Sequence, residues 1–168
     1  NLVAVKEEKP VASVLDVQFK TDGTAEDVSA MQNAVESHPG AALTTYYNST
    51  YGRYVARFNN TWAGSTTGYY KIDYSNNDNF KNALADGHTL EAVVMADYPE
   101  PIPNGEAKFF SSHEAGGTGM MICNTGNGKN GLNEFTFLPN VSTNGKSSWK
   151  WATTGVQPVK KQFYHIIG

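Results

Sequence analysis

Residues 88–98 read HTLEAVVMADY and carry the strongest β-strand signal in the chain. A loop-like segment precedes this run and a cluster of Gly, Asn and Pro follows it, which is how a short strand is bounded. Downstream, strand-like runs alternate with turn-forming clusters as far as the last residue. These runs are residues 107–112 (AKFFSS), 118–123 (TGMMIC), 133–138 (NEFTFL), 147–153 (SSWKWAT) and 161–168 (KQFYHIIG).

Upstream of residue 88, apolar and polar residues alternate with a period of two, as they do in half-buried strands. The clearest runs are 12–19 (ASVLDVQF), 51–58 (YGRYVARF) and 68–74 (GYYKIDY), and the chain is strand-like from Ala42 onward. In the second run the alternation sets Arg53, Val55 and Arg57 on the side opposite Tyr54, Ala56 and Phe58. About ten short strands with no convincing long helix predict an all-β sandwich or barrel.

Two segments depart from this pattern. Residues 24–36 (TAEDVSAMQNAVE) have the composition of a short helix, but an irregular crossing fits them equally well. Residues 75–87 (SNNDNFKNALADG) read as a loop with one helical turn, in which Phe80 and Leu84 pack at i, i+4 spacing. No internal repeat is visible, which excludes propellers and solenoids.

The composition limits both fold and function. The 168 residues suffice for one domain with a real core, and we expect residues 1–11 to form an N-terminal tether to a domain that spans 12–168. Charged residues make up only 17%, the net charge is −3 and no Lys/Arg cluster occurs, which argues against nucleic acid as a partner. No apolar run approaches the ~20 residues that cross a bilayer, so no transmembrane segment is expected.

Three segments, in order, resemble the concanavalin A-like lectin/glucanase superfamily, and within it the laminin-G-like jelly-roll domains. They are LADGHTLEAVVMADY (84–98), AKFFSSHEAGGTGMMICNTGNG (107–128) and KQFYHIIG (161–168). The resemblance covers roughly residues 14–168. It implies an antiparallel two-sheet β-sandwich, the concanavalin A-like jelly roll. Because this architecture hosts lectins, glycanases and adhesion domains, it does not specify a ligand.

In that family the H-x-x-G strand, here residues 165–168, leads into further strands that close the sandwich. We therefore expect the jelly roll to be incomplete at its C-terminus, with the strand at 161–168 frayed and its neighbours unpaired. The resemblance also implies that the missing C-terminal strands, and a downstream catalytic domain, would pack against the chain.

The residues themselves argue against an enzyme. Retaining glycanases need two carboxyl groups about 5 Å apart, and no predicted strand holds two acidic residues at i, i+2 or i, i+4. The four histidines are scattered without the spacing of a metal site. The resemblance implies that His165, which matches a histidine of the family's strand, is structural. The single cysteine, Cys123, lies in an apolar string and reads as a small buried side chain.

Aromatic residues are the positive signal for a ligand site, because sugars stack their C–H faces on flat rings. Trp62 lies in the loop NNTWAGSTT, and Tyr69 follows it on the next strand. Trp149 and Trp151 share one strand face by their i, i+2 spacing, as either a binding platform or a core stripe. The densest cluster of oxygen ligands holds Asp73, Asn76, Asn77 and Asp78. The resemblance to laminin-G-like domains implies a calcium site here, with Asp73, Asn76 and Asp78 as its ligands, and a simple polar turn is the other interpretation.

These observations favour a non-catalytic, lectin-like module with an oligo- or polysaccharide as its partner and no cofactor other than calcium. A signal peptide would lie upstream of the tether, so we expect a secreted, periplasmic or cell-surface location, with attachment to a hydrolase domain as one arrangement. A protein-interaction or structural spacer domain of laminin-G type is the alternative. A glycoside hydrolase is the weaker one.

Overall fold

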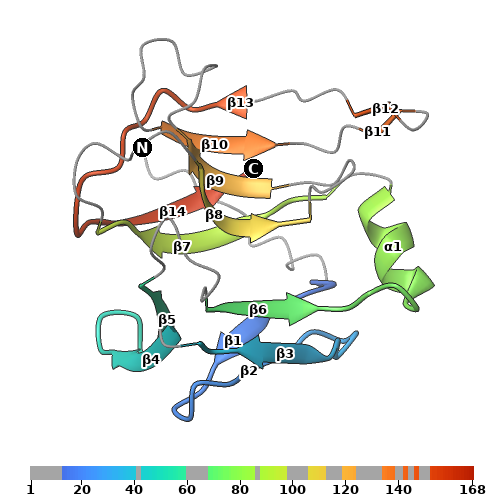
Figure 1. The fold of residues 1–168 in the computed structure, drawn as a ribbon, viewed down its shortest axis with the longest axis horizontal. Coiled ribbons are helices and arrows are strands. Elements are labelled where there is room, and N and C mark those ends of the chain that lie inside the picture. The colour runs from blue at the N-terminus through green and yellow to red at the C-terminus, as the bar shows by residue number, and fades with distance from the viewer. Residues whose placement is uncertain are drawn as a thin grey trace, which may run out of the picture. The chain divides into compact units, whose positions relative to one another are not determined.

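The computed structural model describes residues 13–40, 43–59, 68–85, 88–97, 106–112, 119–123, 134–138, 142–143, 146–147 and 152–168. Within these ranges the chain forms fourteen β-strands and one short α-helix, and every strand pair is antiparallel (Figure 1). The expectation of an antiparallel all-β fold is therefore confirmed. The backbone divides into two compact units, Asn1–His88 (unit 1) and Thr89–Gly168 (unit 2).

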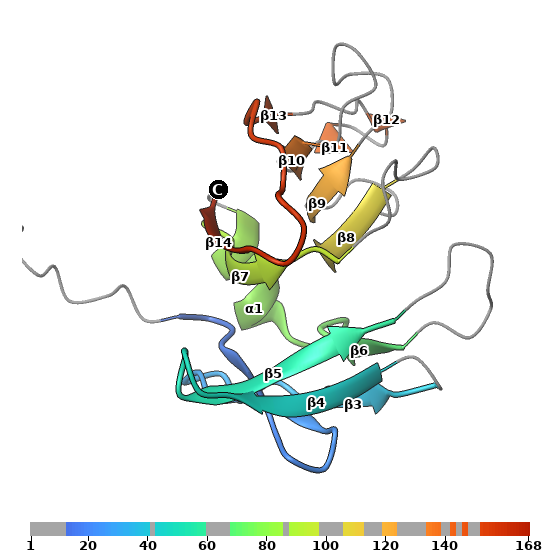
Figure 2. The same ribbon diagram turned by 90° about the vertical axis from the view of Figure 1, so that its left-hand side faces the viewer.

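Unit 1 is built from three antiparallel strand pairs and a helix. The pairs are β1 (Val17–Phe19) with β2 (Ala25–Asp27), β3 (Val35–His38) with β6 (Tyr69–Ile72), and β4 (Leu43–Asn48) with β5 (Arg53–Phe58), and the helix is α1 (Asp78–Ala85). The β4–β5 pair is the longest hairpin, with six residues on each strand. Figure 2 shows its two strands side by side.

Three aromatic side chains from different pairs meet on the inner side of unit 1. The ring of Tyr70 lies 5.2 Å from that of Phe19 on β1 and 6.1 Å from that of Phe58 on β5. Its hydroxyl donates a hydrogen bond to the carbonyl of Gly23, at 2.9 Å. Next to this cluster, Gly68 allows the backbone to approach closely, because a Cβ there would lie 2.5 Å from the Cβ of the buried Leu43. The alternation read from the sequence therefore places Tyr70 inside and its neighbour Tyr69 outside.

A buried carboxylate organises the turns of unit 1. Asp27, only 7% exposed, accepts hydrogen bonds from the backbone amides of Asp16, Ser29 and Asn33 at 2.7–2.9 Å. The Ser29 hydroxyl and the Asn33 side-chain amide donate two more. Burial by itself would raise the pKa of Asp27, but these hydrogen bonds outweigh it and lower the pKa from 3.8 to about 2.

These side-chain bonds explain the path of residues 24–36. Asp27 and Ser29 bind the backbone amides that a helix would use, so the chain continues from β2 through a turn into β3. Neither of the two structures that the sequence leaves open covers the whole segment: Ala25–Asp27 form β2, Val35 begins β3, and an irregular turn joins the two strands.

The helical turn expected within 75–87 forms as the longer helix α1, and the same network fixes where this helix begins. Asn77 precedes the first helical residue and its Oδ1 accepts a hydrogen bond from the amide of Phe80, at 3.0 Å. The Asn77 side-chain amide donates to Oδ1 of Asn33, at 2.9 Å. Phe80, 3% exposed, packs against Tyr74 with ring centroids 5.1 Å apart. Asp27, Asn33 and Asn77 thus link the strands to the helix cap.

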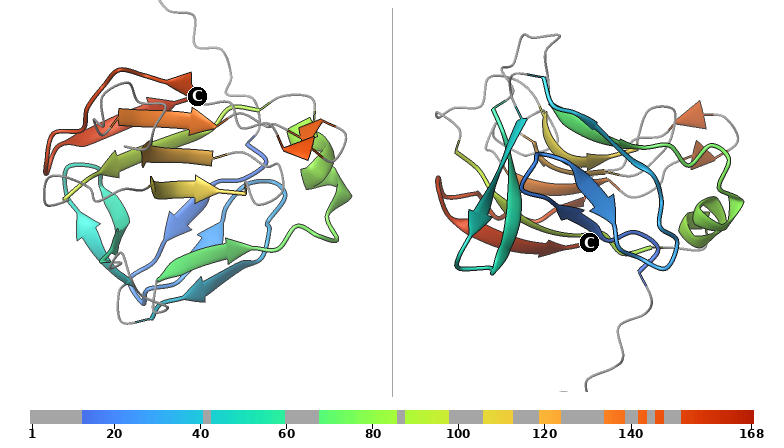
Figure 3. Two further views of the ribbon diagram at one scale, coloured as in Figure 1. Left: turned by 45° about the horizontal axis from the view of Figure 1, so that its top comes forward. Right: turned by 90° about the horizontal axis from the view of Figure 1, so that it is seen from below.

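Unit 2 contains a four-stranded sheet and two smaller strand pairs. The sheet has the order β13 (Ala152–Thr153), β10 (Glu134–Leu138), β9 (Gly119–Cys123), β8 (Glu106–Ser111). The other pairs are β7 (Glu91–Met95) with β14 (Phe163–Ile167), and β11 (Ser142–Thr143) with β12 (Lys146–Ser147). The two views of Figure 3 show β8, β9 and β10 side by side.

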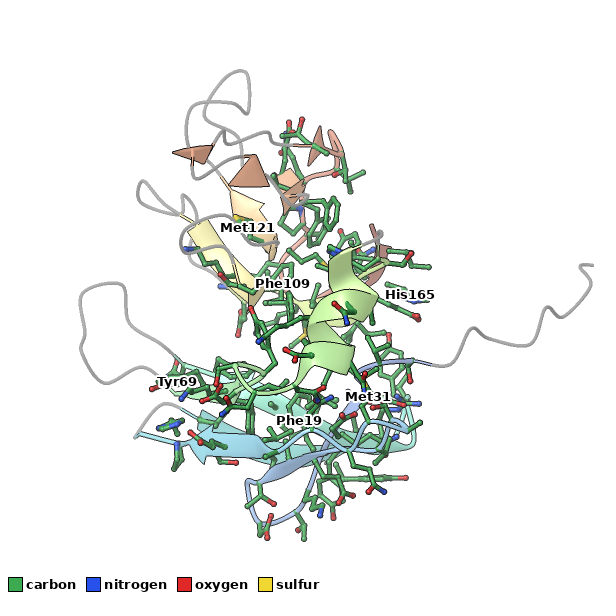
Figure 4. All side chains as sticks on the ribbon, turned by 90° about the vertical axis from the view of Figure 1, so that its right-hand side faces the viewer. Phe19, Met31, Tyr69, Phe109, Met121 and His165 are labelled. Carbon is green, nitrogen blue, oxygen red and sulfur yellow. The ribbon has the colours of Figure 1, made fainter. Side chains whose placement is uncertain are left out.

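Apolar packing holds unit 2 together. Ile122 on β9 and Phe135 on β10 are at most 3% exposed and form a core with Ala96. Phe135 contacts the ring of Phe109 at 6.2 Å and that of Tyr164 at 4.9 Å. Tyr164 comes from β14 and Phe109 from β8, so Phe135 joins the β7–β14 pair to the four-stranded sheet. Phe109 and Met121 lie on the adjacent strands β8 and β9 (Figure 4).

The expected fraying of residues 161–168 is wrong. Residues Phe163–Ile167 pair with β7 along its whole length, and Gly168 exchanges backbone hydrogen bonds with Leu90, at 2.7 and 2.9 Å. Tyr164 and Ile166 pack on the core of unit 2, and this burial stabilises the strand in its register. The sequence run at 147–153 corresponds to β13 at its end, and residues 148–151 lie outside the described ranges, as does the predicted tether at 1–11.

We expect Asp27→Ala to lower the free energy of unfolding by about 3 kcal/mol, because several buried amide donors lose their acceptor. Asp22→Ala is the matched control. Asp22 also accepts hydrogen bonds from a residue close in sequence, Thr24, but it is exposed, so its loss should cost much less stability than the loss of Asp27. Urea denaturation of both variants measures the difference. Equal effects would show that Asp27 does not hold the turns together.

The lowered pKa of Asp27 also predicts how stability changes in acid. A carboxyl group with a pKa of about 2 in the folded chain and 3.8 otherwise binds more protons when unfolded at intermediate pH. Its contribution of about 2 kcal/mol is present above pH ~4 and is lost as the pH falls through ~2. Asp27→Asn, which does not titrate, should lack this component. Urea midpoints measured from pH 5 to pH 2 would contradict the prediction if both proteins lost stability in parallel.

Candidate functional site

The structure describes some of the predicted site residues and not others. Trp62, Trp149 and Trp151 lie outside the described residues. Tyr69 is the first residue of β6, with Asp73 just beyond its end. Asn76 lies in the following turn and Asp78 is the first residue of α1. Tyr69 is therefore the predicted sugar-binding residue around which a site can be built.

Tyr69 stacks on a histidine from the neighbouring strand. The antiparallel register of β3 and β6 sets His38 opposite Tyr69. The two rings are nearly parallel, with centroids 4.5 Å apart and 13° between their planes. Despite this contact Tyr69 is 46% exposed and the His38 side chain 41% exposed. The pair is an exposed aromatic surface held in one orientation by its partner strand.

Charged side chains continue the same face of the sheet. Glu36 lies opposite Lys71 in the register, and its Oε2 is 3.3 Å from Nε2 of His38 and 3.8 Å from Nζ of Lys71. The same ammonium is 3.9 Å from Oδ2 of Asp73. We call the five residues Glu36, His38, Tyr69, Lys71 and Asp73 the β3–β6 outer face. Figure 4 marks Tyr69 in unit 1.

This face can form both kinds of contact that a sugar requires. The Tyr69–His38 stack offers flat ring surface, and the carboxylates and the ammonium beside it can accept and donate hydrogen bonds. All five side chains are mostly solvated, so each polar contact is weak by itself. The arrangement therefore favours a ligand that touches several of these groups at once.

The acidic side chains of the polar turn at 73–78 have local partners. Asp73 accepts a hydrogen bond from the amide of Ser75, at 2.9 Å, and faces Lys71. Hydrogen bonds from Ser75 hold the pKa of Asp73 below its usual value. Asp78 lies 3.2 Å from Nζ of Lys81. Within the described residues no three His, Cys, Asp or Glu side chains come close enough together to hold a metal ion. These local partners favour the polar turn, and calcium stays a prediction.

Among the described residues of unit 2, an apolar cavity is too small for a sugar. An apolar cavity of about 30 Å³ lies between Phe109, Met121, Phe135, Phe137 and Ile166. This volume holds about one or two water molecules. His165, expected to be structural, lies on the outside of β14, where its Nε2 is 2.6 Å from a carboxylate oxygen of Glu91. In the described part of the chain, no helix is long and apolar enough to cross a bilayer.

Sequence reasoning did not find His38 and Glu36. It judged each histidine by its sequence neighbours, whereas His38 meets Tyr69 across a strand pair whose members lie 31 residues apart. The only available signal was the alternation in VESH (35–38), which puts Glu36 and His38 on one side. That pattern becomes informative only when the partner strand and register are known.

Variants of the β3–β6 outer face should fold normally. We expect Tyr69→Ala and Glu36→Gln each to lower the free energy of unfolding by less than about 1 kcal/mol, since exposed ion pairs and cross-strand contacts contribute no more than this. Urea denaturation beside Asp27→Ala checks the prediction. A loss as large as that of the Asp27 variant would mean that the face is structural.

Comparisons of the chain with protein-family models, with curated proteins and with solved structures found no match. The function therefore has to be inferred from the residues and their geometry.

Proposed function

We propose that the chain is a non-catalytic carbohydrate-binding module with a concanavalin A-like jelly-roll fold. One observation carries the proposal: Tyr69 and His38 form an exposed, parallel ring stack beside hydrogen-bonding side chains on a rigid strand pair. The antiparallel strands of both units support the fold assignment. A secreted, periplasmic or cell-surface protein, with a hydrolase domain attached, is the setting that this proposal implies.

The ring stack would contact the C–H face of a sugar, and the neighbouring polar groups would bind its hydroxyls. Glu36 accepts and Lys71 donates, so the hydroxyls of a neutral sugar find both kinds of partner within the strand pair. Because Tyr69 is already packed against His38, little ring mobility is lost when a ligand binds. The side chains of this face are about half exposed, so we expect weak binding to one sugar unit and tighter binding to a chain of them.

The absence of catalysis is part of the proposal. Asp27 has the most strongly shifted pKa among the described carboxyl groups, but all of its hydrogen bonds serve the fold. Glu36 and Asp73 on the outer face are separated by Lys71, which contacts both. Hydrogen bonds from Ser75 lower the pKa of Asp73, whereas glycoside hydrolysis needs a carboxyl group whose raised pKa lets it act as the general acid.

The alternative is a protein-interaction or spacer domain of laminin-G type, and one observation in unit 2 favours it. Val93, Met95 and Ile167 lie on the same side of the β7–β14 pair and are 48%, 38% and 63% exposed. Exposed apolar side chains grouped in this way occur at protein interfaces. A glycan array that includes neutral oligosaccharides separates the two functions.

We expect the wild-type chain to bind at least one neutral oligosaccharide on such an array. Tyr69→Ala should weaken that binding about tenfold or more, because a ring–sugar contact of ~1.5 kcal/mol is lost. Tyr69→Phe should retain most of the affinity. Tyr47→Ala is the matched control, since Tyr47 is also exposed (56%) and also contacts a ring, that of Tyr54.

Calorimetric titration of the array's best oligosaccharide into the four proteins gives the measurement. Equal affinity of Tyr69→Ala and wild type would remove the β3–β6 outer face from the proposal. A wild-type chain that binds no glycan would favour the interaction or spacer domain.

A further inference from the structure

A second exposed face of unit 1 carries arginines. The register of β4 and β5 sets Tyr46 opposite Val55, Thr44 opposite Arg57 and Asn48 opposite Arg53, so these six residues share one side of the hairpin. We call them the β4–β5 outer face. The other side of the hairpin contacts the rest of unit 1 at Thr45 and Phe58, since Thr45 donates a hydrogen bond to the Lys20 carbonyl at 2.7 Å and Phe58 contacts Tyr70, while Tyr47 on that side is exposed.

Both arginines of this face are exposed and uncompensated. Among the residues that the structure describes, no carboxylate pairs with Arg53 or Arg57, whereas lysines 20, 71, 81 and 160 each pair with an acid. Tyr46, 40% exposed, lies diagonally between them on the neighbouring strand. The two arginine Cα atoms are four residues apart on an extended strand, which separates them by ~13 Å.

We propose that the β4–β5 outer face binds an extended polysaccharide that carries carboxylate or sulfate groups. Each guanidinium presents a planar fork of donors that matches a carboxylate or sulfate, and the Tyr46 ring between them supports a sugar unit. The spacing of the arginines requires anionic groups that recur along a chain, which a single phosphate or carboxylate ion cannot provide. This proposal depends on the proposed function only for the class of ligand, a glycan, because the β4–β5 outer face is a different site from the β3–β6 outer face.

The charges of unit 1 support this division of ligands. The β3–β6 outer face includes the carboxylates of Glu36 and Asp73 around a single lysine, so it repels an anionic chain. The β4–β5 outer face has two positive charges and no acidic residue. It also has only two cations, whereas proteins that track nucleic acid use many phosphate contacts. An acidic polysaccharide fits this face better than a nucleic acid does.

The test measures binding of the 168-residue chain to polygalacturonate, which carries carboxylates, and to dextran sulfate. Dextran is the neutral control and duplex DNA is the polyanion control. The variants are Arg53→Gln, Arg57→Gln, the double variant and Tyr46→Ala. Lys160→Gln removes one positive charge in unit 2 and is the matched control for net charge. Urea denaturation confirms that each variant is folded.

We expect one or both acidic polysaccharides to bind, with little binding of dextran at this face. Each single arginine variant should lose about tenfold in affinity and the double variant essentially all of it, while Lys160→Gln stays within about twofold. NaCl at ~0.5 M should weaken wild-type binding strongly. Tyr69→Ala should leave this binding unchanged, which separates a failure here from a failure of the β3–β6 outer face.

Several results would overturn the proposal. They are no binding of either acidic polysaccharide, equal binding by the double arginine variant, an equal loss in Lys160→Gln, or tighter binding of duplex DNA than of both polysaccharides. If the proposal holds, the polysaccharide that binds with the higher affinity shows whether carboxylate or sulfate is the recognised group.

Discussion

The carboxylate of Asp27 accepts five hydrogen bonds from groups that have no strand or helix partner of their own. Strands of three and four residues, such as β1, β2 and β3, are too short to be stable as isolated hairpins. The segments around these strands all donate hydrogen bonds to one buried acceptor, Asp27. These bonds replace the backbone hydrogen bonds that longer strands would provide. Asn33 also accepts a hydrogen bond from Asn77, the residue that caps α1, so the start of α1 depends on the same acceptor. A charge in this position is favourable only because every oxygen is satisfied.

The residues of the two outer faces of unit 1 are not needed for stability, because the inner residues and the Asp27 network stabilise the fold. In β6 the strand period of two sends Tyr70 to the inner cluster and Tyr69 to the outside. In β5 it sends Phe58 inward and Arg57 outward. Stability comes from the inner residues and from Asp27, so the outer residues can change without loss of the fold. Unit 2 differs, since its core rests on Phe135 and apolar neighbours, with no comparable polar centre among the described residues.

Much of the fold follows from local pattern. The alternation in 51–58 gave the two sides of β5 correctly, and Phe80 marked the helix. Pairings between distant segments did not follow from it: β3 meets β6, and β7 meets β14 about 70 residues later. For that reason the sequence does not predict the His38–Tyr69 stack. The expected fraying of residues 161–168 follows from the family resemblance, which does not show that β7 is their partner. Asp27 was also missed, because one acidic residue in a polar stretch looks the same whether it is exposed or buried. The tryptophan predictions concern residues outside the described ranges and stay predictions.

Flat faces on strands bind differently from pockets, and this bears on what kind of glycan the chain suits. A shallow surface leaves a ligand partly solvated, so one ring contact or one arginine fork contributes little affinity. The side chains are, however, fixed on paired strands, and little ordering cost is added when a second or third sugar unit makes contact. Affinity then grows along the ligand, and the length of a hairpin such as β4–β5 sets how many units can contribute. A polymer gains from such a surface where a monosaccharide does not. The two faces differ in charge, so we expect the β3–β6 outer face to select neutral polymers and the β4–β5 outer face to select acidic ones.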